Sequence, residues 1–225
     1  MPPYWVSVEG IEGVGKSHLA RLLAAQLGDR CLLLSEVTDQ QAPCLTSQVI
    51  TALSRAGDFW LRTGHPATET LALLAVKVHE YERLHARPDP LPEIIIEDRG
   101  IDSAALYQAA ILTAPDASPD AVQTAAERIY ATARHWRPLP DRTLLLTDAP
   151  ATCLGRLEQR TGHTFSTEDR ALIGRAGQMY AAQAAREPGR FRIIDRAGRT
   201  TGETVQDMRR ACSRPPVAGG QRCAM

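Results

Sequence analysis

The chain has 225 residues, 44% of them hydrophobic, and equal numbers of basic and acidic residues, 26 of each. This length suffices for one buried core, so we expect a single domain, and the balanced charge argues against nucleic acid as a partner. The five cysteines follow no disulfide or zinc spacing, and no stretch is typical of a signal peptide or membrane span, so we expect a cytoplasmic protein with no membrane partner.

Short apolar runs alternate with longer helical patterns, which predicts βαβ units of the α/β class around a parallel sheet. With right-handed crossovers, helices would cover both faces of this five-stranded sheet. The expected strands are 4–9, 31–35, 93–97, 143–147 and 191–194. The expected helices are 17–27, 68–86, 102–112, 119–135, 150–160, 170–186 and 202–212. Residues 1–212 would form the domain and residues 213–225, which lack periodicity, a disordered tail.

A glycine-rich loop joins the first expected strand to the first expected helix. The loop matches the phosphate-binding P-loop pattern, which is Gly10, four further residues and then Gly15, Lys16 and Ser17. It stands between a strand and a helix, as this pattern requires. Backbone N–H groups and the helix dipole would bind phosphate oxygens, with Lys16 on the β- and γ-phosphates and Ser17 on Mg²⁺. We therefore predict a P-loop NTPase fold. The nucleotide-binding residues expected in this segment are Gly10, Glu12, Gly13, Val14, Gly15, Lys16, Ser17 and His18.

The P-loop alone does not name the reaction, because kinases, regulatory GTPases and motor ATPases all carry it. Apart from Lys16 the chain has one lysine, Lys77, which follows Val76 rather than asparagine, so the guanine-reading NKxD motif is absent. The minimal sheet uses nearly the whole chain and leaves no room for the further domains of a motor ATPase. A small phosphotransferase fits this length.

Two charged residues follow the third expected strand. The carboxyl ends of parallel strands meet at one edge of the sheet, where ligands bind, so Asp98 and Arg99 should lie beside the P-loop. Asp98 would hold Mg²⁺ or its water shell, and Arg99 would bind a phosphate through two hydrogen bonds. A helix-initiating aspartate beside a surface arginine is the alternative that these two residues leave open.

Two motifs in the same order resemble those of the thymidylate kinase family of nucleoside monophosphate kinases. The first is VEGIEGVGKS. The second, at residues 98–108, begins with DR, continues after two residues with DS, and ends after three more with YQ. The resemblance extends over roughly residues 4–210. It implies Mg²⁺-dependent phosphoryl transfer from ATP to a nucleoside monophosphate, dTMP first, and a homodimer packed through the helices at 68–86 and 102–112.

The resemblance also implies roles for individual residues of the acceptor pocket. Glu12 would accept a hydrogen bond from the 3′-hydroxyl of the acceptor sugar, and Arg99 would hold the acceptor phosphate. Tyr107 and Gln108 would line the pocket.

A lid at about 160–172 would, by the same resemblance, supply an arginine to the transferring phosphoryl group. Arg160 and Arg170 are the candidates, and Arg156 is expected to pack against adenine. In a chain this rich in arginine, ordinary surface positions are the alternative for all three. The catalytic residues expected are Lys16, Asp98, Arg99, Arg160 and Arg170, with Ser17 and Asp98 as metal ligands.

Two stretches depart from the family pattern. After the second strand the family carries an arginine and then Glu-Pro-Gly-Gly, of which only Glu36 is present here. On the substrate helix, Leu73 replaces a phenylalanine that stacks on thymine, and Lys77 replaces an arginine that reads the base. Lys77 can donate to a base carbonyl, but it does not reproduce the planar fork of an arginine.

These departures leave the acceptor open. A nucleoside or specialised small-molecule kinase of the same family, with Glu36 as general base toward a hydroxyl acceptor, is the alternative. A module that binds ATP without transferring phosphate is a third reading. Glu12, Asp98 and Arg99 argue against it, because a pure binder has no use for acceptor ligands.

Overall fold

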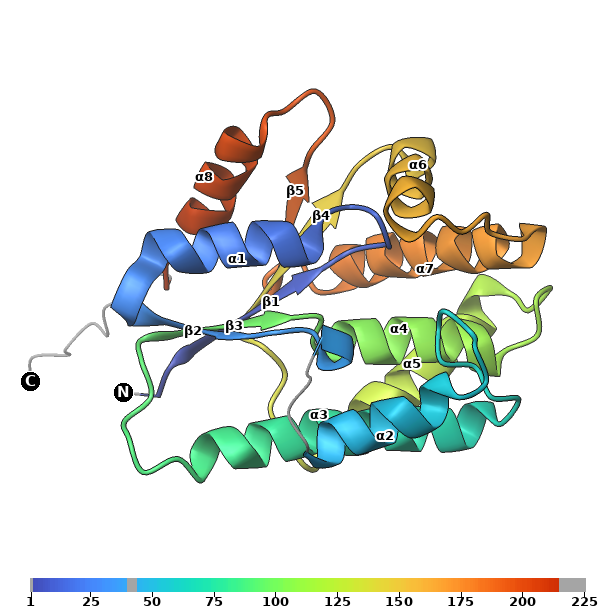
Figure 1. The fold of residues 1–225 in the computed structure, drawn as a ribbon, viewed down its shortest axis with the longest axis horizontal. Helices are drawn as coiled ribbons and strands as arrows, with labels where there is room; N and C mark the ends of the chain where they lie inside the picture. Colours follow the sequence, from blue (N-terminus) through green and yellow to red (C-terminus); the bar gives the residue numbers. More distant parts are fainter. Residues whose placement is uncertain (1, 40–43, 215–225) are drawn as a thin grey trace, which may run out of the picture.

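A five-stranded parallel sheet lies at the centre of the computed structural model, which describes residues 2–39 and 44–214 (Figure 1). Its strands run in the order β2-β3-β1-β4-β5, and every neighbouring pair is parallel. The bounds are β1 (Tyr4–Glu9), β2 (Cys31–Leu34), β3 (Ile94–Asp98), β4 (Arg142–Thr147) and β5 (Phe191–Asp195). All five expected strands are present, which confirms the α/β class. The expected tail, apart from Ser213 and Arg214, lies outside the described residues.

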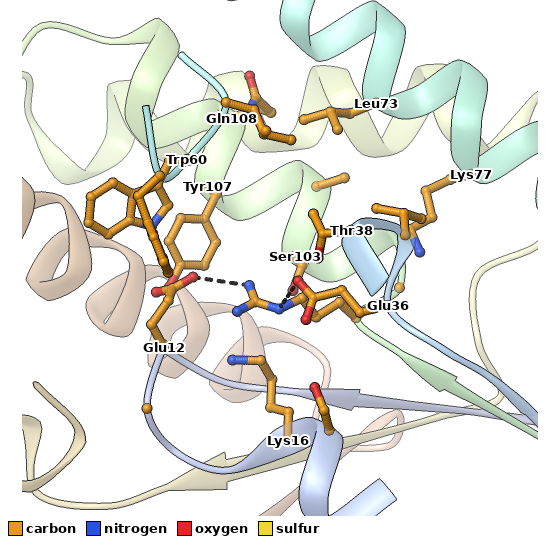
Figure 2. Close-up of a pocket in the computed structure, with 18 of the residues that line it drawn as sticks. Glu12, Lys16, Glu36, Thr38, Trp60, Leu73, Lys77, Ser103, Tyr107 and Gln108 are labelled. Atoms are coloured by element: carbon orange, nitrogen blue, oxygen red, sulfur yellow. Dashed lines mark hydrogen bonds and ion pairs between the residues drawn. The ribbon is translucent and has the colours of Figure 1, made fainter. Parts of the chain in front are cut away.

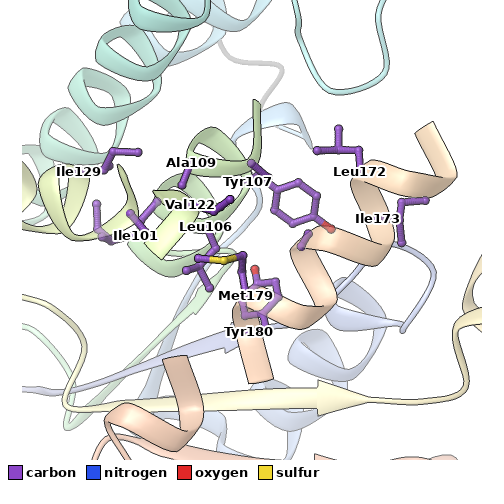
Figure 3. Close-up of a cluster of buried hydrophobic side chains, with 14 of the residues drawn as sticks. Ile101, Leu106, Tyr107, Ala109, Val122, Ile129, Leu172, Ile173, Met179 and Tyr180 are labelled. Carbon is purple, nitrogen blue, oxygen red and sulfur yellow. The ribbon is translucent and has the colours of Figure 1, made fainter. Parts of the chain in front are cut away.

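The central strands β1 and β3 are buried along their whole length, because helices cover both faces of the sheet. Helices α1 (Lys16–Leu27) and α8 (Thr201–Ala211) pack against each other on one face (Figure 1). Helices α3 (Pro66–His85), α4 (Ile101–Leu112), α5 (Pro119–Arg134) and α7 (Thr167–Arg186) lie on the other. The core of this second face joins side chains of α4, α5 and α7 (Figure 3).

Helix α2 (Leu45–Ser54) was not predicted from the sequence and packs on α3. Its two threonines and its isoleucine and valine are β-branched residues that lower intrinsic helix propensity, so tertiary packing supports this helix. The loop that follows α2 lies beside the candidate site.

The expected lid is mostly helical. Helix α6 (Pro150–Thr161) ends at Gly162 in the left-handed conformation, with φ 65°, and α7 begins at Thr167 rather than at the expected Arg170. The earlier start comes from a capping box in which Ser166 and Asp169 bond to each other's backbone N–H groups. Only residues 162–166 form the loop between the two helices.

Helix α4 is an interior helix, with nine of its 12 residues buried inside the chain. Ala104, Ile111 and Leu112 are the residues of α4 that are not buried. Helix α3 is more exposed to solvent, and 62% of the surface of Leu71 is accessible. None of the helices in the described ranges combines the length and hydropathy of a membrane span.

Candidate active site

The loop between β1 and α1 is built by glycines in conformations that other residues rarely adopt. Gly13 has φ 76° and Gly15 has φ 93°. A Cβ atom at Gly13 would stand 1.9 Å from the carbonyl oxygen of Cys153, so α6 packs directly on the loop backbone. Val14 points into the core and is fully buried. The loop therefore offers its backbone to the cavity, as phosphate binding requires.

Lys16 is buried and folded back over this loop. Its Nζ donates to the carbonyl oxygens of Gly10, 2.7 Å away, and Ile11, 2.8 Å away. Burial, together with the nearby positive charge of Arg99, lowers the pKa of Lys16 to about 8. A phosphate placed here would restore the charged form.

The end of β3 brings Asp98 next to the first turn of α1, where Ser17 hydrogen-bonds to its carboxylate. Burial raises the pKa of Asp98, and its Oδ1 atom is buried without a hydrogen-bond partner. A buried, orphaned carboxylate oxygen beside a hydroxyl fits the oxygen ligands that Mg²⁺ takes. Residues 2–39 and 44–214 hold no group of three or more His, Cys, Asp and Glu side chains placed for a metal, so phosphate and water would complete such a shell.

Arg99 lies between two carboxylates. Its Nη1 is 3.0 Å from Glu12 Oε1, and its Nε is 2.8 Å from Glu36 Oε1 (Figure 2). Tyr107 donates its hydroxyl proton to the other oxygen of Glu12. Burial opposes ionisation of Glu12, but Arg99 and Lys16 outweigh it and lower its pKa, so Glu12 is an anion.

These elements enclose one cavity of about 710 Å³ (Figure 2). The expected site residues that line it are Glu12, Gly13, Gly15, Lys16, Ser17, His18, Glu36, Leu73, Lys77, Arg99, Tyr107, Gln108 and Arg160. Nucleotide-site and acceptor-site residues from five separate segments therefore share one space. The expected residues that do not line it are Gly10, Val14, Asp98, Arg156 and Arg170.

The ammonium group of Lys77 is held by buried acids rather than left free for a ligand. Its Nζ is 3.0 Å from Glu80 and 3.3 Å from Glu97. Glu97 in turn accepts hydrogen bonds from both terminal nitrogens of Arg137, at 3.0 and 2.9 Å, and from the Trp5 indole at 2.8 Å. Glu80, three residues after Lys77, was the one sequence signal for this network.

The expected arginines of the lid differ in where they lie. Arg160 lines the cavity. Arg170 is instead paired with Glu158, with Nη2 2.6 Å from Oε1, and its Nε donates to a lid carbonyl. Arg156 pairs with Asp148 at 2.6 Å. Of the two candidates for the transferring group, the geometry therefore favours Arg160.

Sequence reasoning missed two contacts to the site. Arg196, in the loop between β5 and α8, donates to the carbonyl oxygen of Val14 on the P-loop. Trp60 and Leu61, in the loop after α2, line the cavity. No local pattern marks either contact, because each depends on segments far apart in the chain.

The chain is similar in sequence to known proteins over most of its length. A sequence model described as thymidylate kinase matches residues 8–208. The chain is 34% identical over 220 residues to a thymidylate kinase of Cereibacter sphaeroides, covering 93% of each chain. It is 31% identical over 196 residues to one of Methylococcus capsulatus, covering 86% of this chain and 88% of that one.

Two solved structures share the fold. The thymidylate kinase of Ehrlichia chaffeensis is similar with a TM-score of 0.64 and 19% identity, over 92% of this chain and 97% of that one. The thymidylate kinase of Candida albicans is similar with a TM-score of 0.65 and 20% identity, over 92% of this chain and 89% of that one.

Proposed function

The chain belongs to the thymidylate kinase family, and from this premise we propose that it transfers the γ-phosphoryl group of ATP to dTMP, giving dTDP and ADP. One observation carries the proposal most: Arg99 and Glu12, suited to an acceptor, line the same cavity as the P-loop residues Lys16 and Ser17. An ATP-binding module without transfer would have no use for the first pair.

The P-loop would hold the donor. Its backbone N–H groups and the start of α1 face the phosphates, and Lys16 turns from the carbonyls of Gly10 and Ile11 to the β- and γ-phosphates. Bound at Ser17 and Asp98, Mg²⁺ would neutralise charge on the phosphate oxygens. Little covalent help is needed in this reaction, so positioning and positive charge make up the catalysis.

Arg99 would hold the acceptor phosphate. Its guanidinium is already oriented by Glu12 and Glu36, and a phosphate would replace at least one of these carboxylates. Because the attacking atom of a nucleoside monophosphate is an ionised phosphate oxygen, no general base is required. The carboxylate of Glu36 is paired with Arg99 rather than left free to face an acceptor hydroxyl, which favours a phosphate acceptor.

Arg160 would supply the remaining cation from the lid. In related phosphotransferases such an arginine contributes about 10³- to 10⁵-fold in rate. We propose that residues 1–212 work as a single kinase domain, with a lid at about 160–172 that excludes water when ATP and acceptor are bound.

We also propose a homodimer that uses the open face of α3, where Leu71 is exposed, and a cytoplasmic location. Light scattering at micromolar concentration should then give twice the chain mass, and a charged residue in place of Leu71 should return the monomer. A monomeric unmodified protein would contradict the dimer without affecting the proposed reaction.

The proposed reaction is tested with γ-labelled ATP and a panel of acceptors. We expect label in dTDP, and a fall of at least about 100-fold in Lys16→Ala, because a preorganised cation on the transferring group is lost. Transfer to thymidine but not to dTMP would support the alternative, in which Glu36→Gln should abolish activity. Unchanged transfer in Lys16→Ala would refute the proposal.

A further inference from the structure

The loop that joins α2 to α3 forms one wall of the cavity. Phe59, Trp60 and Leu61 all line it. Leu61 and Arg99, each with φ 61°, are the two non-glycine residues in the described ranges with positive φ. Both lie at the cavity, and such strain is concentrated where a ligand is bound.

This loop is held firmly from within. The carboxylate of Asp58 accepts hydrogen bonds from the backbone N–H of Trp60 at 2.9 Å and of Arg62 at 3.0 Å. It also accepts two from the Arg62 side chain, at 2.9 and 2.7 Å. Arg62 reaches across to Asp169 of α7 at 2.7 Å. The backbone around Trp60 therefore has a defined place relative to the lid.

The indole ring is packed as firmly as its backbone. Its centroid is 4.9 Å from that of Phe59 and 5.4 Å from that of Phe165 in the lid loop. The guanidinium of Arg62 lies 5.4 Å from the ring centroid. With only 9% of its surface exposed, Trp60 cannot turn its N–H toward bulk water without breaking these contacts.

The Nε1 atom of Trp60 is nevertheless buried without a hydrogen-bond partner. Buried indole N–H groups normally have one, and in this chain Trp5 shows the usual case, because its Nε1 donates to Glu97 at 2.8 Å. Trp60 lines the cavity, so a bound ligand can supply the acceptor that this donor lacks. As a donor only, the indole needs an acceptor.

Figure 2 shows which labelled side chains lie on the same side of the cavity as Trp60. Trp60, Tyr107 and Glu12 gather at one end of the cavity, and Leu73 and Lys77 lie at the other. The acceptor phosphate would lie on Arg99, so the part of the nucleotide between Glu12 and Trp60 is a neutral one. A sugar hydroxyl satisfies both neighbours, because its proton goes to the carboxylate while its oxygen accepts from the indole.

We infer that the indole N–H of Trp60 donates a hydrogen bond to the 3′-oxygen of the bound acceptor nucleotide, whose hydroxyl proton goes to Glu12. This inference rests on the proposed function. Trp60 is then a binding residue that recognises the sugar of dTMP.

The test compares Trp60→Phe with the unmodified protein, since phenylalanine keeps a packed ring and removes only the N–H donor. The KM and dissociation constant for dTMP should rise about 3- to 10-fold, the usual effect of one neutral hydrogen bond. The dissociation constant for 3′-deoxythymidine monophosphate and the KM for ATP should not change. Trp136→Phe is the matched control, because Trp136 is 66% exposed.

Equal weakening for both nucleotides would mean that Trp60 is only structural, and no weakening would mean that it binds nothing. Either result overturns the inference. If Trp60→Phe does not fold, the indole proton signal of Trp60 in the unmodified protein, assigned with Trp5→Phe and Trp136→Phe, should shift downfield with dTMP but not with the 3′-deoxy nucleotide. Failure of the unmodified protein to bind dTMP would instead overturn the proposed function, and this inference with it.

Discussion

Arg99 and Glu12 form an ion pair inside the candidate active site, with Nη1 3.0 Å from Oε1, although 87 positions separate them in the sequence. The pair joins the end of β3 to the P-loop. Without substrate, the cation suited to the acceptor phosphate is therefore occupied by protein carboxylates. On the proposed function, acceptor binding would be an exchange of anions on Arg99, and its strength would depend on how well a phosphate fits the guanidinium fork.

Arg99→Lys should lower kcat/KM for dTMP about 10- to 100-fold, because an ammonium keeps the charge but loses the bidentate, charge-assisted hydrogen bonds. The KM for ATP should change little. Steady-state kinetics with each substrate varied in turn measures both values. Arg186→Lys, at an exposed pair with Glu127, is the control and should behave as the unmodified protein. Equal losses for ATP and dTMP would contradict a role for Arg99 at the acceptor.

ATP binding should depend on pH through Lys16. Its pKa in the free protein is about 8, below the usual 10.5, so Lys16 is protonated below pH 8 and neutral above it. The nucleotide phosphates favour the protonated form. Affinity for ATP should therefore be constant at lower pH and fall above pH 8, by up to about tenfold per pH unit. Calorimetry in buffers of different ionisation heat should show proton uptake at pH 9. An affinity for ATP that stays constant between pH 7 and 9.5 would refute this role of Lys16.

The buried network around Glu97 should be the most sensitive charged part of the core. Glu97→Gln leaves Arg137 buried without its anion and leaves Lys77 with Glu80 alone, and it should cost about 3 to 5 kcal/mol in the free energy of unfolding. Urea denaturation measures this. Glu93→Gln is the matched control, because Glu93 pairs with Arg30 at the surface and should change stability by less than about 1 kcal/mol. Similar effects for both variants would argue against the buried network.

The same carboxylate should make the protein sensitive to acid. Burial alone would raise the pKa of Glu97, but Arg137 and Lys77 outweigh it and lower the pKa from 4.5 to about 2. Its contribution to stability is therefore complete above pH 4.5 and is lost as the pH falls from 4.5 toward 2. This contribution is roughly 3 kcal/mol. Denaturation curves at several pH values should show a smaller slope in Glu97→Gln over this range.

Gly13→Ala should disrupt the P-loop, because its new Cβ would stand 1.9 Å from the carbonyl oxygen of Cys153 and the residue has φ 76°. We expect the loss of measurable ATP binding and a lower melting temperature. Gly28→Ala separates the two causes, since its φ is 57° but nothing lies within 4 Å of the added Cβ. That variant should cost about 1 to 3 kcal/mol, because its ψ of −139° lies outside the left-handed helical region, and leave activity intact. Equal effects of the two variants would mean that the strained backbone conformation, rather than the packing of α6 on the loop, causes the loss.

The parts that local sequence predicted are those built from neighbouring residues. The strands at 4–9 and 31–34, the P-loop and α1 follow from apolar runs and glycine spacing, and the structure places them within a residue of expectation. Helix α2 and the start of α7 at Thr167 were not predicted. Tertiary contacts support the first and a capping box sets the second.

The sheet, the phosphate-binding loop and the family could be predicted from the sequence, because these depend on local backbone conformation and on short motifs. Three features could not: Lys77 is bound to buried acids, Arg160 rather than Arg170 reaches the cavity, and the indole N–H of Trp60 is buried without a partner. They depend on residues that are far apart in the chain. A side chain's partners are set by the packing of segments tens of residues apart, and no spacing along the chain encodes which charges and rings will meet.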